Sequence, residues 1–364
     1  MPFPRELTIA TTAETQAPAP GAGRTRLPKR PSAASILGLS LVGLVVVWLV
    51  VNFVKAPSNF VEIFLIGLTN GAVYGLVALG YTLVYGILQL INFAHGDVFA
   101  LSGMVAFTFL FSVLHVGINP PALTIVGAIV ATLAVTMTMF AGVNVLVELV
   151  GYRRLRSAPR LAPLITAVGM SFIIQNIGLA VYGVQFRSGS DLVPHTNVFS
   201  VFGVSYQWNK LMVLLVTIPV LLGLTWFVEA TRQGKAMRAT SQDMEAAAVM
   251  GINVNRTISI TFALAGALAA VAGLLYMVQF NVRYDTGFEL GLIAFTSAVL
   301  GGVGNLPGAV LGALVIGFIQ AFNEGLTWNA PGSDWTRSIV FGILIAILVF
   351  RPEGLLGERT PEGG

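Results

Sequence analysis

A short polar segment, Asn92-Phe93-Ala94-His95-Gly96-Asp97, interrupts an apolar stretch that runs from Ile63 to Phe111. Polar groups at such a depth must face protein or water, because lipid cannot satisfy their hydrogen bonds. Ionisable residues inside a membrane are therefore candidates for function. Two interpretations stay open: the break shapes the path of a polar solute, or His95 lies at the membrane edge while Asp97 caps the next helix.

A second polar group lies in the apolar run 163–184, where Thr166, Ser171, Gln175 and Asn176 stand among apolar residues. Ser171 and Gln175 are four residues apart, so they share one face of a helix. Such a stripe either lines a path or joins two packed helices through hydrogen bonds. We favour the second interpretation.

The polar loop 230–256 contains a helix-prone segment from Gln242 to Met250, with Glu245, Ala246 and Ala247 inside it and Gly251 after it. Glycine takes the left-handed conformation that ends a helix. The two alanines leave a small surface that can enter a groove on a partner, and Glu245 and Arg238 offer charged contacts at its edge. The alternative is an ordinary loop helix in which these residues have only helix-forming and capping roles.

A third feature is the segment Gly301-Gly302-Val303-Gly304-Asn305-Leu306-Pro307-Gly308. Glycine and proline at this density break a helix. In a membrane protein the break is either a hinge or gate in a broken helix or a tight turn between two short spans, and we favour the turn.

Several chemistries are excluded. The chain has no cysteine, and its three histidines, His95, His115 and His195, are far apart in the sequence, so we predict no metal site. No H-E-x-x-H or G-x-x-x-x-G-K-[ST] motif is present, and Ser102 and Gly103 stand in the wrong order for a Gly-x-Ser peptidase. We expect no catalytic residue and no cofactor in this chain. If ATP drives its function, another subunit must bind the nucleotide.

Composition indicates a membrane protein. Hydrophobic residues make up 55% of the 364 residues and charged residues only 10%, against about 25% charged residues in soluble domains. The mean hydropathy is +0.83, and the 40 glycines suit close helix packing. The net charge of +4 comes from a few short basic loops, so nucleic acid is not an expected partner.

The apolar runs predict an all-α, polytopic membrane helical bundle with eight to ten transmembrane segments, some of them broken. Residues 1–35 read as a disordered polar tail, 36–350 as the transmembrane domain and 351–364 as a second tail. The first run, Ile36 to Val54, has no cleavage site after it and is predicted to be an uncleaved span. The run 63–91 is too long for one simple span and contains five glycines, which predicts a break or a strong tilt. The runs 289–303 and 307–323 are either two short spans or a re-entrant pair.

Lysines and arginines predict the orientation. With ten crossings and the N-terminus inside, fifteen of the 20 basic residues fall in inside segments and five in outside ones. Positive charge accumulates on the cytoplasmic side, so both tails and the loop 230–256 are expected in the cytoplasm.

Four segments carry a resemblance to a known family. The loop 230–256 resembles the EAA loop of ABC import permeases, although it lacks the I-x-L-P ending. LVALGYTLVYGILQLINFAHGD, YRRLRSAPRLAPLITAVGMSFIIQN and the glycine-rich segment within 263–317 closely resemble branched-chain amino acid ABC transporter permeases of the LivH/LivM type. Together these matches cover most of 60–350.

The resemblance implies a multi-pass permease subunit in the plasma membrane of a prokaryote that imports branched-chain amino acids. It implies that Glu245, Ala246, Ala247 and Gly251 dock onto ATPase subunits, which hold the ATP. A second permease, identical or different, and an extracytoplasmic substrate-binding protein would complete the importer.

Two alternatives stay open. Relatives in this family import other small solutes, so urea or another short amide is one. The other is a secondary transporter driven by ions, which needs buried carboxylates. The few available, Glu62, Asp97, Glu148 and Glu324, all lie near predicted helix ends.

Overall fold

The computed structural model describes residues 33–117, 120–156, 158–159, 161–194, 196–201, 203–351 and 353–357. Most of the predicted tail 1–35 therefore lies outside the described residues. The chain divides into two compact units, Met1–Val50 and Val51–Gly364. The described part of the first unit is helical and belongs to α1 (Ala33–Lys55).

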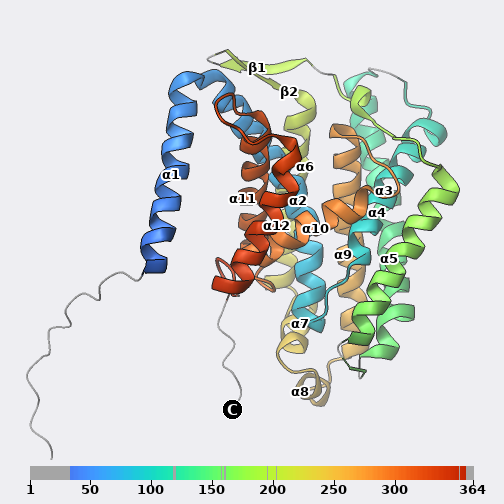
Figure 1. Cartoon of the computed structure of the whole chain (residues 1–364). Coiled ribbons are helices and arrows are strands. Elements are labelled where there is room, and N and C mark those ends of the chain that lie inside the picture. The colour runs from blue at the N-terminus through green and yellow to red at the C-terminus, as the bar shows by residue number, and fades with distance from the viewer. Residues whose placement is uncertain are drawn as a thin grey trace, which may run out of the picture. The chain divides into compact units, whose positions relative to one another are not determined.

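The second unit is a bundle of helices with one small hairpin (Figure 1). Helix α3 continues into a π-helical turn, Phe109–Val113, and α4 continues into Glu148–Tyr152 and the 3-10 turn Arg153–Leu155. The main helices are α2 (Pro57–Leu88), α3 (Ala94–Thr108), α4 (Ala122–Val147), α5 (Leu161–Tyr182), α6 (Trp208–Ala230), α7 (Arg232–Gln242), α8 (Met244–Val249), α9 (Val254–Gln279), α10 (Thr286–Gly301), α11 (Leu306–Gly325) and α12 (Ser333–Phe350).

The predicted polytopic helical class is confirmed. Eight helices of the described chain are long and apolar enough to cross a membrane, and Val42–Lys55 and Thr286–Gly301 are shorter apolar helices. The loop between α5 and α6 adds what the sequence did not predict, an antiparallel hairpin of β1 (Asn197–Val201) and β2 (Val204–Gln207). The hairpin lies at one end of the bundle and α7 and α8 lie at the other (Figure 1). We call these the hairpin end and the α8 end.

The predicted break in 63–91 is wrong, because α2 is one continuous helix of 32 residues. Its glycines serve close packing instead. A Cβ on Gly71 would lie 2.8 Å from the Leu314 Cα atom, and a Cβ on Gly317 would lie 2.4 Å from the Gly71 nitrogen. Small residues at a crossing let two membrane helices approach closely, so α2 packs closely along α11.

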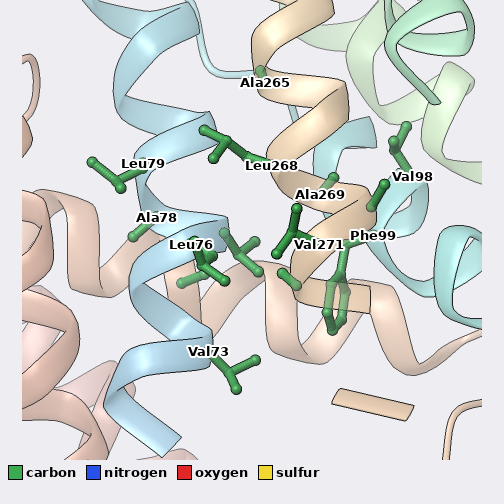
Figure 2. Close-up of a cluster of buried hydrophobic side chains, with 14 of the residues drawn as sticks. Val73, Leu76, Ala78, Leu79, Val98, Phe99, Ala265, Leu268, Ala269 and Val271 are labelled. Carbon is green, nitrogen blue, oxygen red and sulfur yellow. The ribbon is translucent and has the colours of Figure 1, made fainter. Parts of the chain in front are cut away.

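The core lies where α2, α3 and α9 meet (Figure 2). Leu76 of α2, Phe99 of α3, and Leu268 and Val271 of α9 lie in this centre, whereas Leu79 is buried on the opposite side of α2. Association in lipid depends on close packing rather than on hydrophobic transfer. The alanines and glycines of α9 provide that packing, because they bring its backbone directly against its neighbours.

Helix α10 has 16 residues and packs inside the bundle against α2, α3, α11 and α12. Its start lies directly on α3, since a Cβ on Gly96 would lie 2.3 Å from the Gly287 carbonyl oxygen. Its end is the predicted glycine turn, where Gly302 has φ +107° and Gly304 has φ +93°. Helix α11 then begins at Leu306 and returns toward the hairpin end.

Candidate functional site

Helix α8 is a separate short helix with defined ends. The Asp243 side chain accepts hydrogen bonds from the backbone nitrogens of Glu245 (2.8 Å) and Ala246 (2.9 Å), which caps its N-terminus. Gly251 follows with φ +84°, so its predicted left-handed conformation is confirmed. The helix starts at Met244 rather than Gln242, because Asp243 is extended and divides α7 from α8.

The outer surface of α8 is apolar. Glu245 and Ala246 are exposed, whereas Ala247 is buried in its own chain. Val249 is 87% exposed and Met250 is 82% exposed. A docking role for these two residues was not predicted, although apolar side chains at the end of a polar loop helix indicate a contact surface. The exposed surface of Ala246, Val249 and Met250 is hereafter the α8 patch.

Arg238 was predicted to offer a charged contact at the edge of this patch, but it binds α6 instead. Its guanidinium donates hydrogen bonds to the backbone carbonyls of Val228 and Glu229 (3.3 Å for Glu229) at the end of α6. A cation at a helix C-terminus satisfies carbonyls that have no partner within the helix. Arg238 therefore fastens α7 to α6.

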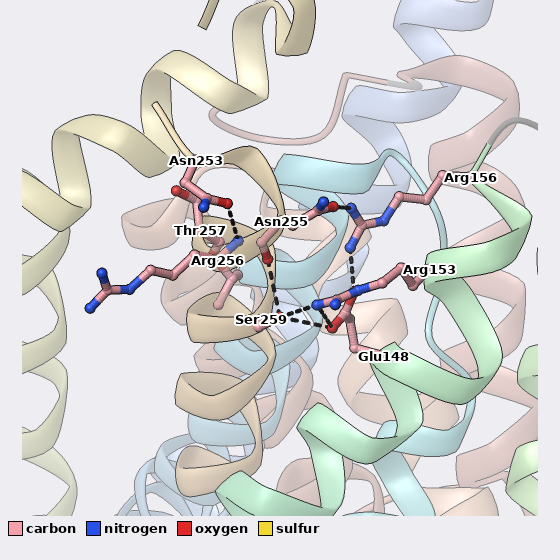
Figure 3. A network of polar contacts seen from close by, with 9 residues as sticks. Glu148, Arg153, Arg156, Asn253, Asn255, Arg256, Thr257 and Ser259 are labelled. Carbon is pink, nitrogen blue, oxygen red and sulfur yellow. Dashed lines mark hydrogen bonds and ion pairs between the residues drawn. The ribbon is translucent and has the colours of Figure 1, made fainter. Parts of the chain in front are cut away.

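A buried ion-pair cluster anchors the start of α9, which follows α8 directly (Figure 3). Glu148 is 0% exposed and pairs with Arg153 (3.0 Å) and with Arg156. The Ser259 hydroxyl on α9 donates to the Glu148 carboxylate at 2.9 Å, and Arg156 donates to the Asn255 side chain at 2.7 Å. The cluster joins the end of α4 to the start of α9.

Two arginines share the one buried carboxylate in this cluster, so it keeps a net positive charge. Burial lowers the pKa of the Arg156 guanidinium from its ordinary value, and the Glu148 charge opposes that shift. A guanidinium keeps its proton at all physiological pH values. The cluster also has two side-chain partners on α9, Asn255 and Ser259. It thus holds the connection between α4 and α5 against the first turns of α9.

Asp97 joins α3 to α5. Its carboxylate is buried and accepts hydrogen bonds from the Ser171 hydroxyl and from the Gln175 side-chain nitrogen (3.0 Å). The alternative that Asp97 caps α3 is wrong, because the N-cap residue is Phe93. Ser171 and Gln175 therefore join two helices, as predicted. Asn176 is separate: it is exposed and donates to the Phe172 carbonyl of its own helix.

The other residues of the polar break are also inside the protein. The His95 ring is fully buried, lies edge-on to Tyr81 with 4.9 Å between ring centroids, and packs against Gly80. It does not lie at an exposed edge. The Asn92 side chain accepts a hydrogen bond from the Tyr152 hydroxyl (3.2 Å), and Phe93 faces Phe295.

The glycine-rich segment forms a tight turn that the end of the chain covers. The backbone nitrogens of Leu355 and Leu356 donate to the carbonyls of Leu300 (2.8 Å) and Gly301 (3.0 Å). Asn305 caps α11 by accepting from the Gly308 nitrogen at 2.8 Å. Residues 353–357 of the predicted tail thus pack against the bundle, while 352 and 358–364 lie outside the described residues.

A cavity of about 620 Å³ at the α8 end is lined by both the glycine-rich turn and α7. Gly304 and Pro307 line it from the turn, Gly86 from α2, and Met237 and Arg238 from α7. The glycine-rich turn and the predicted docking loop therefore line one cavity. Residues 92–97 do not line it.

Comparison with known proteins identifies the family. Residues 63–349 match the model of the family described as branched-chain amino acid transport system, permease component. The chain belongs to this family. A high-affinity branched-chain amino acid transport system permease protein, BraD of Pseudomonas aeruginosa, is 39% identical over 81% of this chain and 95% of its own length. The corresponding protein LivH of Escherichia coli K12 is 34% identical over the same shares.

More distant likenesses also exist. The ribose import permease RbsC of Escherichia coli K12 is 27% identical over 78% of this chain and 83% of its own length. The solved structure of PsaBC from Streptococcus pneumoniae in complex with Fab has a TM-score of 0.43 and 16% identity, covering 83% of this chain and 95% of that one.

Family membership assigns a class of activity. This permease is a multi-pass membrane transport subunit and not an enzyme, as predicted. Permeases of ABC importers work with ATPase subunits and solute-binding proteins, so partners of these two kinds follow from the family.

Changing Asp97 tests whether the polar break is structural. Asp97→Asn removes the charge that strengthens the bonds from Ser171 and Gln175, and we expect it to destabilise this permease by about 1–3 kcal/mol. The measurement is the melting temperature in detergent. Asn176→Ala is the matched control on α5, because its amide bonds only within its own helix. An unchanged melting temperature together with lost uptake would instead place Asp97 on the transport path.

Proposed function

We propose that this permease, paired with a second permease subunit, forms the membrane pathway of an ATP-driven importer of branched-chain amino acids. The substrate class comes from the named activity of BraD and LivH, which match this chain over most of its length. In this proposal an extracytoplasmic binding protein delivers the amino acid at the hairpin end. ATP binds to two ATPase subunits, which grip α8 at the other end.

The α8 loop is the single observation that carries the proposal. Its helix is capped by Asp243, ended by Gly251, and exposes the apolar α8 patch beyond the bundle. Apolar side chains at this exposure favour burial against a partner. Glu245 is exposed beside the patch and offers a charged contact, while buried Ala247 supports the helix from below.

Movement of α8 would pass directly to the transmembrane helices. Only four residues separate the end of α8 from the start of α9, and the Glu148 cluster ties that start to α4. We propose that this movement changes the translocation path near the polar break. The residues concerned are Asn92, Phe93, His95, Gly96 and Asp97, with Gln175 and Asn176 on α5. Gly301, Gly302, Gly304 and Pro307 are the proposed hinge.

The orientation follows from charge. Basic residues of the described chain gather at the α8 end: Arg153, Arg154, Arg156, Arg232, Lys235, Arg238, Arg256 and Arg351. The positive-inside tendency therefore favours a cytoplasmic α8 end. We therefore propose that both chain termini are cytoplasmic and that α8 is within reach of soluble ATPase subunits.

Competition during uptake tests the substrate class. The importer is reconstituted with its binding protein in vesicles loaded with ATP, and labelled leucine uptake is measured. Unlabelled isoleucine and valine are expected to compete, while urea is not. Uptake without ATPase subunits would favour an ion-coupled transporter. Absence of leucine uptake, together with ATP-driven uptake of labelled urea, would move the assignment to a short amide.

A further inference from the structure

A second cavity, of about 810 Å³, lies toward the hairpin end and shares no lining residue with the cavity at the α8 end. It is enclosed by the middle of α2, the end of α9, the first turns of α10 and α12, and the end of α11. Its lining combines apolar side chains with charged ones, unlike the apolar core beside it. A charged cavity inside a membrane-embedded bundle is a candidate for solute binding.

Two arginines in this cavity are already paired with carboxylates. The Arg337 guanidinium binds both Glu289 oxygens, at 2.5 and 2.6 Å. Arg283 binds both Asp285 oxygens, at 2.6 and 2.5 Å. Arg337 is 69% exposed and Glu289 is 44% exposed. Water screens the charges of exposed pairs of this kind, so they contribute little. Arg337 can therefore exchange Glu289 for another carboxylate with little loss.

Two further carboxylates in the lining, Glu324 and Asp334, have no cationic partner within 4 Å in the described part of the chain. Glu324 is held in place by neighbours. One of its oxygens accepts from the Thr336 hydroxyl (2.8 Å) and from the Gln320 side-chain nitrogen (3.2 Å), and Gln320 accepts from the Tyr74 hydroxyl (2.5 Å). The cavity thus has a fixed carboxylate and an excess of negative charge.

Part of the remaining lining is apolar. Phe280 packs against Tyr276 with 4.8 Å between ring centroids, and both rings line the cavity with Leu290 and Ile293. Within the described residues, no three acidic or histidine side chains gather closely enough to hold a metal ion. The excess negative charge therefore suits an organic ammonium group better than a metal ion.

We infer that this cavity binds the zwitterionic form of an aliphatic amino acid during its passage, an inference that rests on the proposed function. Glu324 receives the ammonium group, and Arg337 leaves Glu289 to bind the carboxylate. The aliphatic side chain packs against Phe280, Leu290 and Ile293. Glu324 and Arg337 line the same cavity, and Arg337 directly follows Thr336, whose hydroxyl donates to Glu324.

Cysteine labelling tests this site, because the natural chain contains no cysteine. Phe280→Cys puts a thiol in the lining, and its modification on this chain by neutral methyl methanethiosulfonate is followed by mass in the full importer. Leucine is expected to slow the modification, whereas 4-methylpentanoate, which lacks the ammonium group, is not. Asp191→Cys, in the exposed loop before β1, is the control and should react equally with or without leucine.

The charge partner is tested in the same background. Adding Glu324→Gln removes a charge-assisted contact of about 1.5–3 kcal/mol, so the leucine concentration for half protection should rise about tenfold or more. Glu324→Asp, which keeps the charge, should retain most of the protection. Equal protection with Gln at 324, or equal protection by 4-methylpentanoate, would overturn the inference.

One comparison separates the two proposals. ATP-driven leucine uptake by the unmodified importer is measured in the same preparation. If uptake occurs but leucine never protects the introduced cysteine, the inference fails and the proposed function stands. If no branched-chain amino acid is taken up, the proposed function fails.

Discussion

Met250→Asp is expected to abolish ATP-driven uptake while leaving the bundle folded. Met250 is 82% exposed at the end of α8, so its replacement disturbs no contact in the core. At an interface with an ATPase subunit, however, the new carboxylate would be buried without a partner. Loss of an apolar anchor typically weakens docking by about 2–4 kcal/mol, which is roughly 30- to 700-fold in affinity. Uptake and copurification of the ATPase subunits measure the effect.

Gln242→Asp is the matched control for this prediction. Gln242 is exposed on the same loop, at the end of α7, and the substitution introduces the same charge without removing an apolar side chain. Uptake by this variant should stay near the wild-type rate. If Met250→Asp retained both uptake and bound ATPase, α8 would not be the docking element.

Glu148→Gln is expected to cause the largest loss of stability. The substitution keeps the size of the side chain but leaves Arg153 and Arg156 without their shared carboxylate. Removing one partner of a buried ion pair costs about 3–5 kcal/mol, and because Arg153 is 36% exposed we expect the lower part of that range. The melting temperature in detergent measures the loss. Uptake should fall as well, since the start of α9 is released.

The same substitution at Glu289 is the control, because it breaks an exposed pair. Glu289→Gln should change the free energy of unfolding by no more than about 1 kcal/mol. Equal losses at Glu148 and Glu289 would show that burial does not strengthen the Glu148 cluster. Intact uptake in a clearly destabilised Glu148→Gln variant would show that the cluster has no part in coupling.

The failed prediction for α2 shows where pattern analysis stops. Glycines inside a long apolar run suggested a break, because glycine weakens an isolated helix. In the bundle Gly67, Gly71 and Gly75 face α11, and the packing that they allow outweighs their low helix propensity. Propensity is a property of a segment, whereas this packing depends on residues more than two hundred positions away.

The docking loop shows the opposite case. Its short helix and the left-handed glycine were predicted because capping depends on residues within a few positions of each other. Which face of that helix is exposed was not predictable, because burial of Ala247 and exposure of Val249 depend on how α8 lies against the bundle.

The sequence alone determined the membrane class, the number of spans within narrow limits, the family resemblance and the loop helix. These properties depend on composition and on residues that are close to one another in the sequence. Only the tertiary structure decided which polar residues meet. Glu148 contacts Ser259 across 111 positions, and Asp97 contacts Gln175 across 78. Such contacts form because burial in lipid leaves each polar group dependent on a partner, and helix packing alone selects that partner.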